Sequence, residues 1–258
     1  MNESISYDWA ADLYDRSRDF PEEIAAHGIP AILETAGPGR LLDVGTGTGR
    51  FSIPLWKAGA DLVGIDLSAK MMARLREKSP PARLAQADAS CLPFAADSFD
   101  AVTTSHVMHL VGPWREALGE FRRVLKPGGV YINSYSERQR NPIREQIRDY
   151  WQRCLTARGA VLRRPGIRDG KELQDELLEM GAKLRHVEVI HFIQTGSLRE
   201  AIERIAARTH SNTLDVPDEI FAAGVRDLRA WAAREFDDLD TPLEEDACFV
   251  LDVARFEA

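Results

Sequence analysis

A glycine-rich segment at residues 41–50, LLDVGTGTGR, carries the clearest chemical signal in the sequence. An apolar run typical of a strand leads into a turn with glycine at every second position, and a helix-compatible stretch follows. Gly45, Gly47 and Gly49 permit unusual dihedrals and the close approach of a ligand, while the amino terminus of the following helix offers unpaired N–H groups. The segment therefore predicts a ligand-binding loop, although a GxGxG turn alone does not identify the ligand.

Two acidic residues further along the chain indicate what the loop binds. Asp66 lies at the end of the second expected strand, in the segment VGIDLS, about 20 residues beyond the loop, where a carboxylate can accept hydrogen bonds from both hydroxyls of a ribose. Asp88 follows a third short apolar run, where it can accept from the exocyclic amine of adenine while the Ala89 N–H donates to the ring. Together the two acids predict an adenosine-containing ligand.

The loop spacing separates two candidate ligands. A dinucleotide loop reads GxGxxG and must neutralise a pyrophosphate, whereas this loop is one residue shorter and Asp43 directly precedes it, a poor neighbour for phosphate. S-adenosylmethionine carries no phosphate, but a sulfonium and an ammonium group. The pattern favours S-adenosylmethionine, and a nucleotide-dependent oxidoreductase, which would share Asp66, is the alternative.

The order of elements predicts one α/β domain over residues 1–258. Nearly continuous apolar runs, each followed by a helix-compatible stretch, are typical of buried parallel strands with crossover helices. Helical cap elements are expected at about 1–30, 142–170 and 197–240. The expected strands are 41–44, 62–65, 101–104, 130–134, 186–193 and 248–255, and the expected later helices are 142–158, 171–180 ending before Gly181, 198–208 and 217–236.

Four segments between residues 7 and 134 together resemble the class I methyltransferases, in the branch that includes the ubiquinone and menaquinone biosynthesis methyltransferases. They are LLDVGTGTG, VGIDLS, AQADASCLPFAADSFDAV and FRRVLKPGG. The resemblance implies a Rossmann-like, doubly wound seven-stranded sheet of order 3-2-1-4-5-7-6, with strand 7 antiparallel. It also implies that YDWAADLYDRSRDF is a helix covering the cofactor, with Tyr14 or Arg18 near the methionine carboxylate; an ordinary amphipathic helix is the alternative.

The predicted site combines these residues with others near the strand ends, where ligands bind in open α/β sheets. His106 and His109 follow the fourth strand and are the candidate catalytic bases. The alternatives are that these histidines are ordinary packed residues, or that the methyl transfer needs no base. Asp43 either contacts the cofactor or holds the loop. The predicted cofactor-binding residues are Asp43, Gly45, Thr46, Gly47, Gly49, Asp66, Leu67, Met71, Asp88, Ala89, Ser105, Tyr14 and Arg18.

Composition limits the partners that we expect. The 258 residues are 44% hydrophobic and 29% charged, with a net charge of -8 and no basic block, so nucleic acid is not an expected partner. The apolar runs are too short for a membrane span, and we expect a cytoplasmic protein. The dispersed cysteines, Cys91, Cys154 and Cys248, predict free thiols and no metal, which disfavours an arsenite methyltransferase.

The expected reaction is therefore transfer of a methyl group from S-adenosylmethionine to a small-molecule acceptor, giving S-adenosylhomocysteine. These motifs do not identify the acceptor. They also do not show whether its attacking atom is oxygen, nitrogen or carbon. A protein that binds S-adenosylmethionine without catalysis remains the alternative from another functional class, and the oligomeric state has no sequence signature.

Overall fold

The computed structural model describes residues 3–9, 11, 14, 20–78, 83–208 and 211–256. The chain divides into two compact units. Unit 1 comprises residues 1–137, 165–190 and 248–258, and unit 2 comprises residues 138–164 and 191–247.

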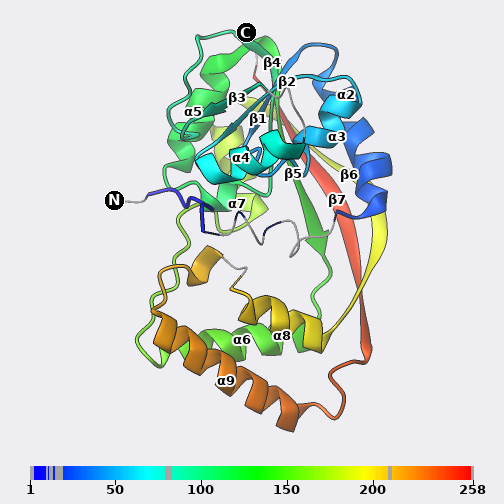
Figure 1. Ribbon diagram of the computed structural model, residues 1–258. Helices are drawn as coiled ribbons and strands as arrows, with labels where there is room; N and C mark the ends of the chain where they lie inside the picture. Colours follow the sequence, from blue (N-terminus) through cyan, green and yellow to red (C-terminus); the bar gives the residue numbers. More distant parts are fainter. Residues whose placement is uncertain are drawn as a thin grey trace. The chain divides into compact units, whose positions relative to one another are not determined.

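A seven-stranded mixed sheet organises the chain, with the strand order β3-β2-β1-β4-β5-β7-β6 (Figure 1). The pairs β1–β2, β1–β4, β2–β3 and β4–β5 are parallel, so the carboxyl ends of these five strands meet at one edge. This order confirms the Rossmann-like fold predicted from the sequence. The strands are β1 (Arg40–Val44), β2 (Asp61–Asp66), β3 (Leu84–Gln86), β4 (Phe99–Ser105), β5 (Leu125–Arg138), β6 (Ala182–Ser197) and β7 (Pro242–Phe256).

Helices cover both faces of the sheet in unit 1. Amphipathic spacing explains α5, which buries Trp114, Leu118 and Phe121 at helical intervals, and Phe121 packs against Tyr131 of β5. Helix α7 adds to the same core, whereas α2 and α3 lie on the opposite side of the sheet from α5 (Figure 1). The elements are η1 (Ile24–Gly28), α2 (Ile29–Ala36), α3 (Ser52–Lys57), α4 (Ala69–Lys78), η2 (Met108–Leu110), α5 (Trp114–Val124) and α7 (Gly170–Glu179).

Unit 2 has a separate apolar core between three helices. Tyr150 stacks on Trp231 with ring centroids 4.3 Å apart, and Trp151 meets Phe221 edge-on. Capping explains where two of the helices begin: the Asn141 side chain caps α6, and Ser197 forms a capping box with the third residue of α8. The elements are α6 (Pro142–Thr156), α8 (Leu198–Ala206), η3 (Ser211–Thr213) and α9 (Asp218–Glu235).

The structure corrects one local expectation. The fifth strand was expected at 130–134, but β5 also includes residues 125–129, LKPGG, where the register with β4 shifts between Phe99 and Ala101. Most of the amino-terminal stretch expected to be a helix, residues 7–20, lies outside the described residues; among those described, Tyr14 is helical and residues 7–9, 11 and 20 are not. The expected stop at Gly181 is confirmed, since that glycine has a φ of 83° directly after α7.

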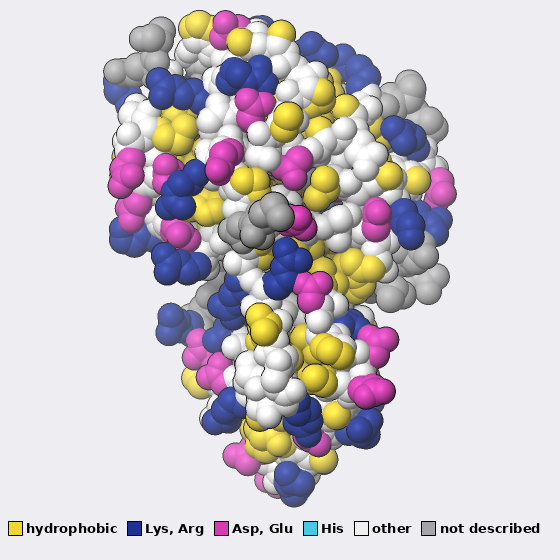
Figure 2. Space-filling view, turned by 90° about the vertical axis from the view of Figure 1, so that its left-hand side faces the viewer, with side chains coloured by type: hydrophobic (Ala, Val, Ile, Leu, Met, Phe, Trp, Pro, Cys, Tyr) yellow, Lys and Arg dark blue, Asp and Glu magenta, His cyan; other side chains and the backbone are white. Residues whose placement is uncertain are grey.

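Two surface features bear on possible partners. Lys and Arg side chains are interspersed with Asp and Glu over the face shown in Figure 2, so this face has no continuous basic surface. No helix in the described part of the chain is both long and apolar enough to cross a membrane.

Candidate functional site

The glycine-rich loop leaves β1 in a conformation that requires its glycines. Gly45 has a φ of 76°, and a Cβ built there would lie 2.2 Å from the Val107 side chain. The Gly45 and Thr46 N–H groups donate to the Ile65 carbonyl at 2.8 and 2.9 Å, which binds the loop to the end of β2. Gly47 has a φ of 55° and lies beside the Met71 side chain. The loop is therefore a tight backbone cradle against the carboxyl ends of β1 and β2.

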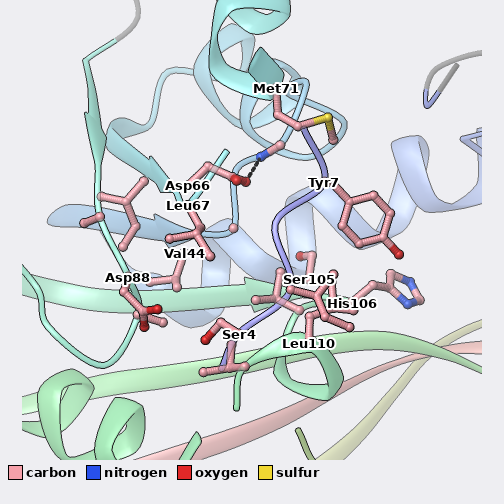
Figure 3. Close-up of a pocket in the computed structure, with 18 of the residues that line it drawn as sticks. Ser4, Tyr7, Val44, Asp66, Leu67, Met71, Asp88, Ser105, His106 and Leu110 are labelled. Atoms are coloured by element: carbon pink, nitrogen blue, oxygen red, sulfur yellow. Dashed lines mark hydrogen bonds between the residues drawn. The ribbon is translucent and has the colours of Figure 1, made fainter. Parts of the chain in front are cut away.

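Asp66 is the central polar group beside this cradle. Its Oδ2 accepts from the Gly47 N–H at 2.8 Å, drawn as the dashed line in Figure 3, and its Oδ1 accepts from the Ser68 N–H at 2.7 Å. Burial raises the pKa of Asp66, and these backbone donors act against that rise. A carboxylate has about four acceptor positions, so the backbone donors do not use all of them. Asp66 is thus held by the backbone and can still accept from a ligand hydroxyl group.

Asp88 and Ala89 lie at one end of the pocket. Asp88 Oδ1 accepts from the Ser90 N–H at 2.9 Å and from the Ser90 hydroxyl at 2.7 Å, which fixes the turn after β3. Within the described ranges, Asp88 Oδ2 accepts no hydrogen bond. That oxygen is the one suited to receive an amine of a bound ring.

One pocket brings most of the predicted residues together. The space between its lining residues is about 730 Å³, which includes a part open to solvent. Figure 3 shows Asp88 at one end, Tyr7 and His106 toward the other, and the Asp66 carboxylate between them. The predicted residues in the lining are Tyr14, Gly45, Gly47, Asp66, Leu67, Met71, Asp88, Ala89, Ser105, His106 and His109.

Four predicted cofactor residues are not among those lining the pocket. Arg18 lies outside the described residues. Thr46 is buried, and its hydroxyl hydrogen-bonds with that of Ser52. A Cβ on Gly49 would lie 2.3 Å from Leu75 of α4, so this glycine allows the helices to pack rather than a ligand to approach.

Asp43 is the fourth of these predicted residues, and its side chain stabilises the glycine-rich loop. Its Oδ2 accepts the hydroxyl proton of Ser52 at the start of α3, and the residue is only 2% exposed. Burial raises the pKa of Asp43 to about 6, although the hydroxyl groups of Ser52 and Thr46 lower it in part. Of the two roles expected for Asp43, these contacts favour holding the loop.

The two candidate catalytic histidines occupy different conformations. His106 has a φ of 56°, a left-handed backbone that is uncommon for residues other than glycine and is often found at functional sites. Its ring centroid lies 6.5 Å from that of Phe51. His109 lies in the short helix η2 and is more exposed. Ser105 precedes them at the end of β4, and its hydroxyl lies 2.6 Å from that of Ser134 on β5.

Sequence reasoning missed the contribution of the extreme amino terminus. Ser4 and Ile5 line the pocket together with Tyr7, which belongs to the stretch expected to cover the cofactor. The Ile5 N–H donates to the Leu110 carbonyl at 2.9 Å. No periodic pattern marks this segment, because backbone atoms and single side chains make its contacts. The apolar lining residues Val107, Leu110 and Val111 also went unpredicted, although their place just after β4 was a usable signal.

Comparisons with known proteins agree with the cradle and the two acids. A family model described as "Methyltransferase domain" matches residues 42–133. A demethylmenaquinone methyltransferase of Renibacterium salmoninarum is 40% identical over 124 residues, covering 47% of this chain and 52% of the relative. A demethylmenaquinone methyltransferase of Thermus thermophilus is 33% identical over 160 residues, covering 58% of this chain and 72% of the relative.

Structural similarity extends over nearly the whole chain but shows the fold alone. The crystal structure of the YcgJ protein of Bacillus subtilis is 17% identical, with a TM-score of 0.59, and the match covers 89% of this chain and 98% of that one. The sequence matches are narrower, since the chain spans about half the length of the Renibacterium relative. From the glycine loop, the two acids and these relatives, we conclude that the chain belongs to the class I S-adenosylmethionine-dependent methyltransferases, in the ubiquinone and menaquinone biosynthesis branch.

Proposed function

We propose that this protein binds S-adenosylmethionine in the pocket of unit 1 and transfers its methyl group to a small-molecule acceptor. One observation carries the proposal: the glycine cradle, the Asp66 carboxylate and Asp88 lie along a single pocket in the order that an adenosine group requires. The Asp66 carboxylate has acceptor capacity left for a ribose hydroxyl, and Asp88 Oδ2 suits the adenine amine. S-adenosylmethionine supplies an electrophilic methyl group on its sulfonium.

The loop geometry disfavours a dinucleotide. A pyrophosphate needs backbone N–H donors from the glycine loop. Here the Gly45 and Thr46 N–H groups already donate to Ile65, and the Gly47 N–H donates to Asp66. The carboxylates of Asp43 and Asp66 also place negative charge close to the loop. These contacts suit a ligand without phosphate.

The far end of the pocket has the side chains needed to hold and activate the acceptor. Tyr14 packs edge-on against Tyr7, with ring centroids 5.9 Å apart, and we assign Tyr14 to the methionine end of the cofactor. His106 lines the same pocket, so its imidazole can take a proton from an attacking oxygen or nitrogen. Walls of Val107, Leu110 and Val111 keep water from the acceptor, and holding the reactants in line supplies much of the acceleration.

The acceptor is a small molecule whose identity the matched region does not determine. The family model ends at residue 133, before unit 2 begins. Demethylmenaquinone is named as the substrate of the relatives, so a demethylated quinol is the first acceptor to test. Phenols, amines and thiols complete the panel.

A methyl-transfer assay tests this function. The protein is incubated with S-adenosylmethionine and each acceptor, and release of S-adenosylhomocysteine is measured. Turnover with at least one acceptor is the expected result, and at a fixed low concentration of S-adenosylmethionine it should be slower in the Asp66→Ala variant. Cofactor binding without turnover on any acceptor would instead favour the non-catalytic binding protein.

A further inference from the structure

The amino-terminal segment at residues 4–8, here called the strap, is fixed to the loop after β4 at one of its ends. The Ile5 N–H donates to the Leu110 carbonyl at 2.9 Å, and the Ser4 hydroxyl oxygen accepts from the Gly112 N–H at 3.3 Å. Ser4, Ile5 and Tyr7 line the pocket, and Tyr7 is only 8% exposed. Figure 3 shows Ser4 and Tyr7 extending from this segment toward the pocket. The strap therefore forms part of the pocket wall.

The other end of the strap is fixed to α4 by one side chain, that of Asp8. Asp8 Oδ1 accepts the hydroxyl proton of Ser68 and the Lys70 N–H, the latter at 3.2 Å. A carboxylate at this place satisfies unpaired N–H groups and interacts favourably with the positive end of the helix dipole. Asp8 thus caps a helix that is 60 residues away in the sequence.

The same contact continues to the ribose-binding carboxylate. The Ser68 hydroxyl accepts from the Met71 N–H at 3.1 Å, and the Ser68 N–H donates to Asp66 Oδ1 at 2.7 Å. Ser68 is fully buried. A chain of hydrogen bonds therefore runs from Asp8 through Ser68 to Asp66, joining the strap to the polar centre of the pocket.

We propose that Asp8 is the latch of the strap: it holds residues 4–8 against the pocket, slows release of the bound cofactor, and positions Asp66 through Ser68. This inference rests on the proposed cofactor site. Ile5 and Tyr7 line the pocket, so a ligand bound there lies beside the strap, and opening of the strap exposes that ligand. Two of the contacts that attach the strap depend on Asp8, and their loss should increase the open fraction. Asp8 is a positioning residue, since its contacts are with Ser68 and α4.

The test measures how fast S-adenosylhomocysteine leaves the protein, by stopped-flow fluorescence with an excess of competing S-adenosylmethionine. Asp8→Ala should raise the dissociation rate constant roughly 2- to 30-fold, the factor expected for losing a capping interaction. Asp8→Asn should stay near wild type, because asparagine retains an oxygen that can cap the helix. Glu77→Ala is the matched control, because Glu77 is an acid on the same helix that pairs with Arg74. It should leave the rate unchanged.

Hydrogen exchange of the peptide covering residues 3–9 is a second measurement that tests the latch. If Asp8 is the latch, Asp8→Ala should speed exchange at the Ile5 amide, which is otherwise protected by the Leu110 carbonyl. A role limited to capping would change exchange in α4 alone and overturn the inference.

The outcomes also separate this inference from the proposed function. If wild-type protein binds S-adenosylhomocysteine and Asp8→Ala releases it at the wild-type rate, the latch is refuted and the cofactor site stands. If wild-type protein does not bind the ligand, both are refuted.

Discussion

Replacing Asp66 with alanine should weaken cofactor binding while leaving the fold intact. The Asp66 carboxylate accepts from the Gly47 and Ser68 N–H groups and lines the pocket, where it can accept from a ribose hydroxyl. Losing hydrogen bonds to a charged group should cost about 1–3 kcal/mol in binding free energy, or about 5- to 150-fold in Kd. The Gly47 N–H also loses its acceptor, so the loop should loosen, and this places the expected result in the upper part of that range.

Calorimetric titration with S-adenosylhomocysteine measures this change, and thermal unfolding of each variant checks that the fold persists. Asp61→Ala is the matched control, because Asp61 begins the same strand but is exposed and paired with Arg83. It should leave Kd unchanged. An unaltered Kd for Asp66→Ala would remove Asp66 from the site, and an equal loss in both variants would show a general effect of altering β2.

Three further predictions follow from the loop and from the end of β4. The pKa of Asp43 rises from its ordinary 3.8 to about 6 on folding, so its contribution to stability is present below pH 3.8 and lost as the pH rises through about 6. Relative to Asp43→Asn, the unfolding free energy of wild type measured with urea should fall by about 3 kcal/mol between pH 3.5 and 7; parallel profiles would contradict this. Gly45→Ala should cost at least about 1–2 kcal/mol of stability because of its left-handed backbone, and it should weaken binding through contact with Val107. Gly119→Ala, with open space around the added carbon, should be neutral or stabilising in the same denaturation assay. His106→Asn, which tolerates the left-handed backbone, should lower kcat about 100-fold or more with an unchanged Kd for S-adenosylhomocysteine if the imidazole is the base; an unchanged kcat would exclude that role.

The parallel strands were predictable because buried parallel strands have a distinctive sequence pattern, whereas the order of the strands was implied by the resemblance to the class I methyltransferases. The apolar run at 101–104 lies in β4, and the short apolar run before Asp88 forms β3. Asp66 and Asp88 were predictable for a related reason: strand ends on one edge converge whatever the details of packing.

The roles of residues that the sequence left open depend on tertiary contacts. Asp43 was compatible with either loop support or ligand contact until the structure placed the Ser52 hydroxyl against its carboxylate. The strap had no periodic pattern, because backbone atoms and single side chains make its contacts. Most of the stretch that resembles a covering helix, residues 7–20, lies outside the described residues.

Parallel calorimetric titrations with S-adenosylmethionine, S-adenosylhomocysteine and NADH test the central claim most directly. Binding of the first two ligands, with no binding of NADH, is the result that the cradle, Asp66 and Asp88 predict. Binding of NADH alone would contradict the account and make a nucleotide-dependent oxidoreductase the working assignment.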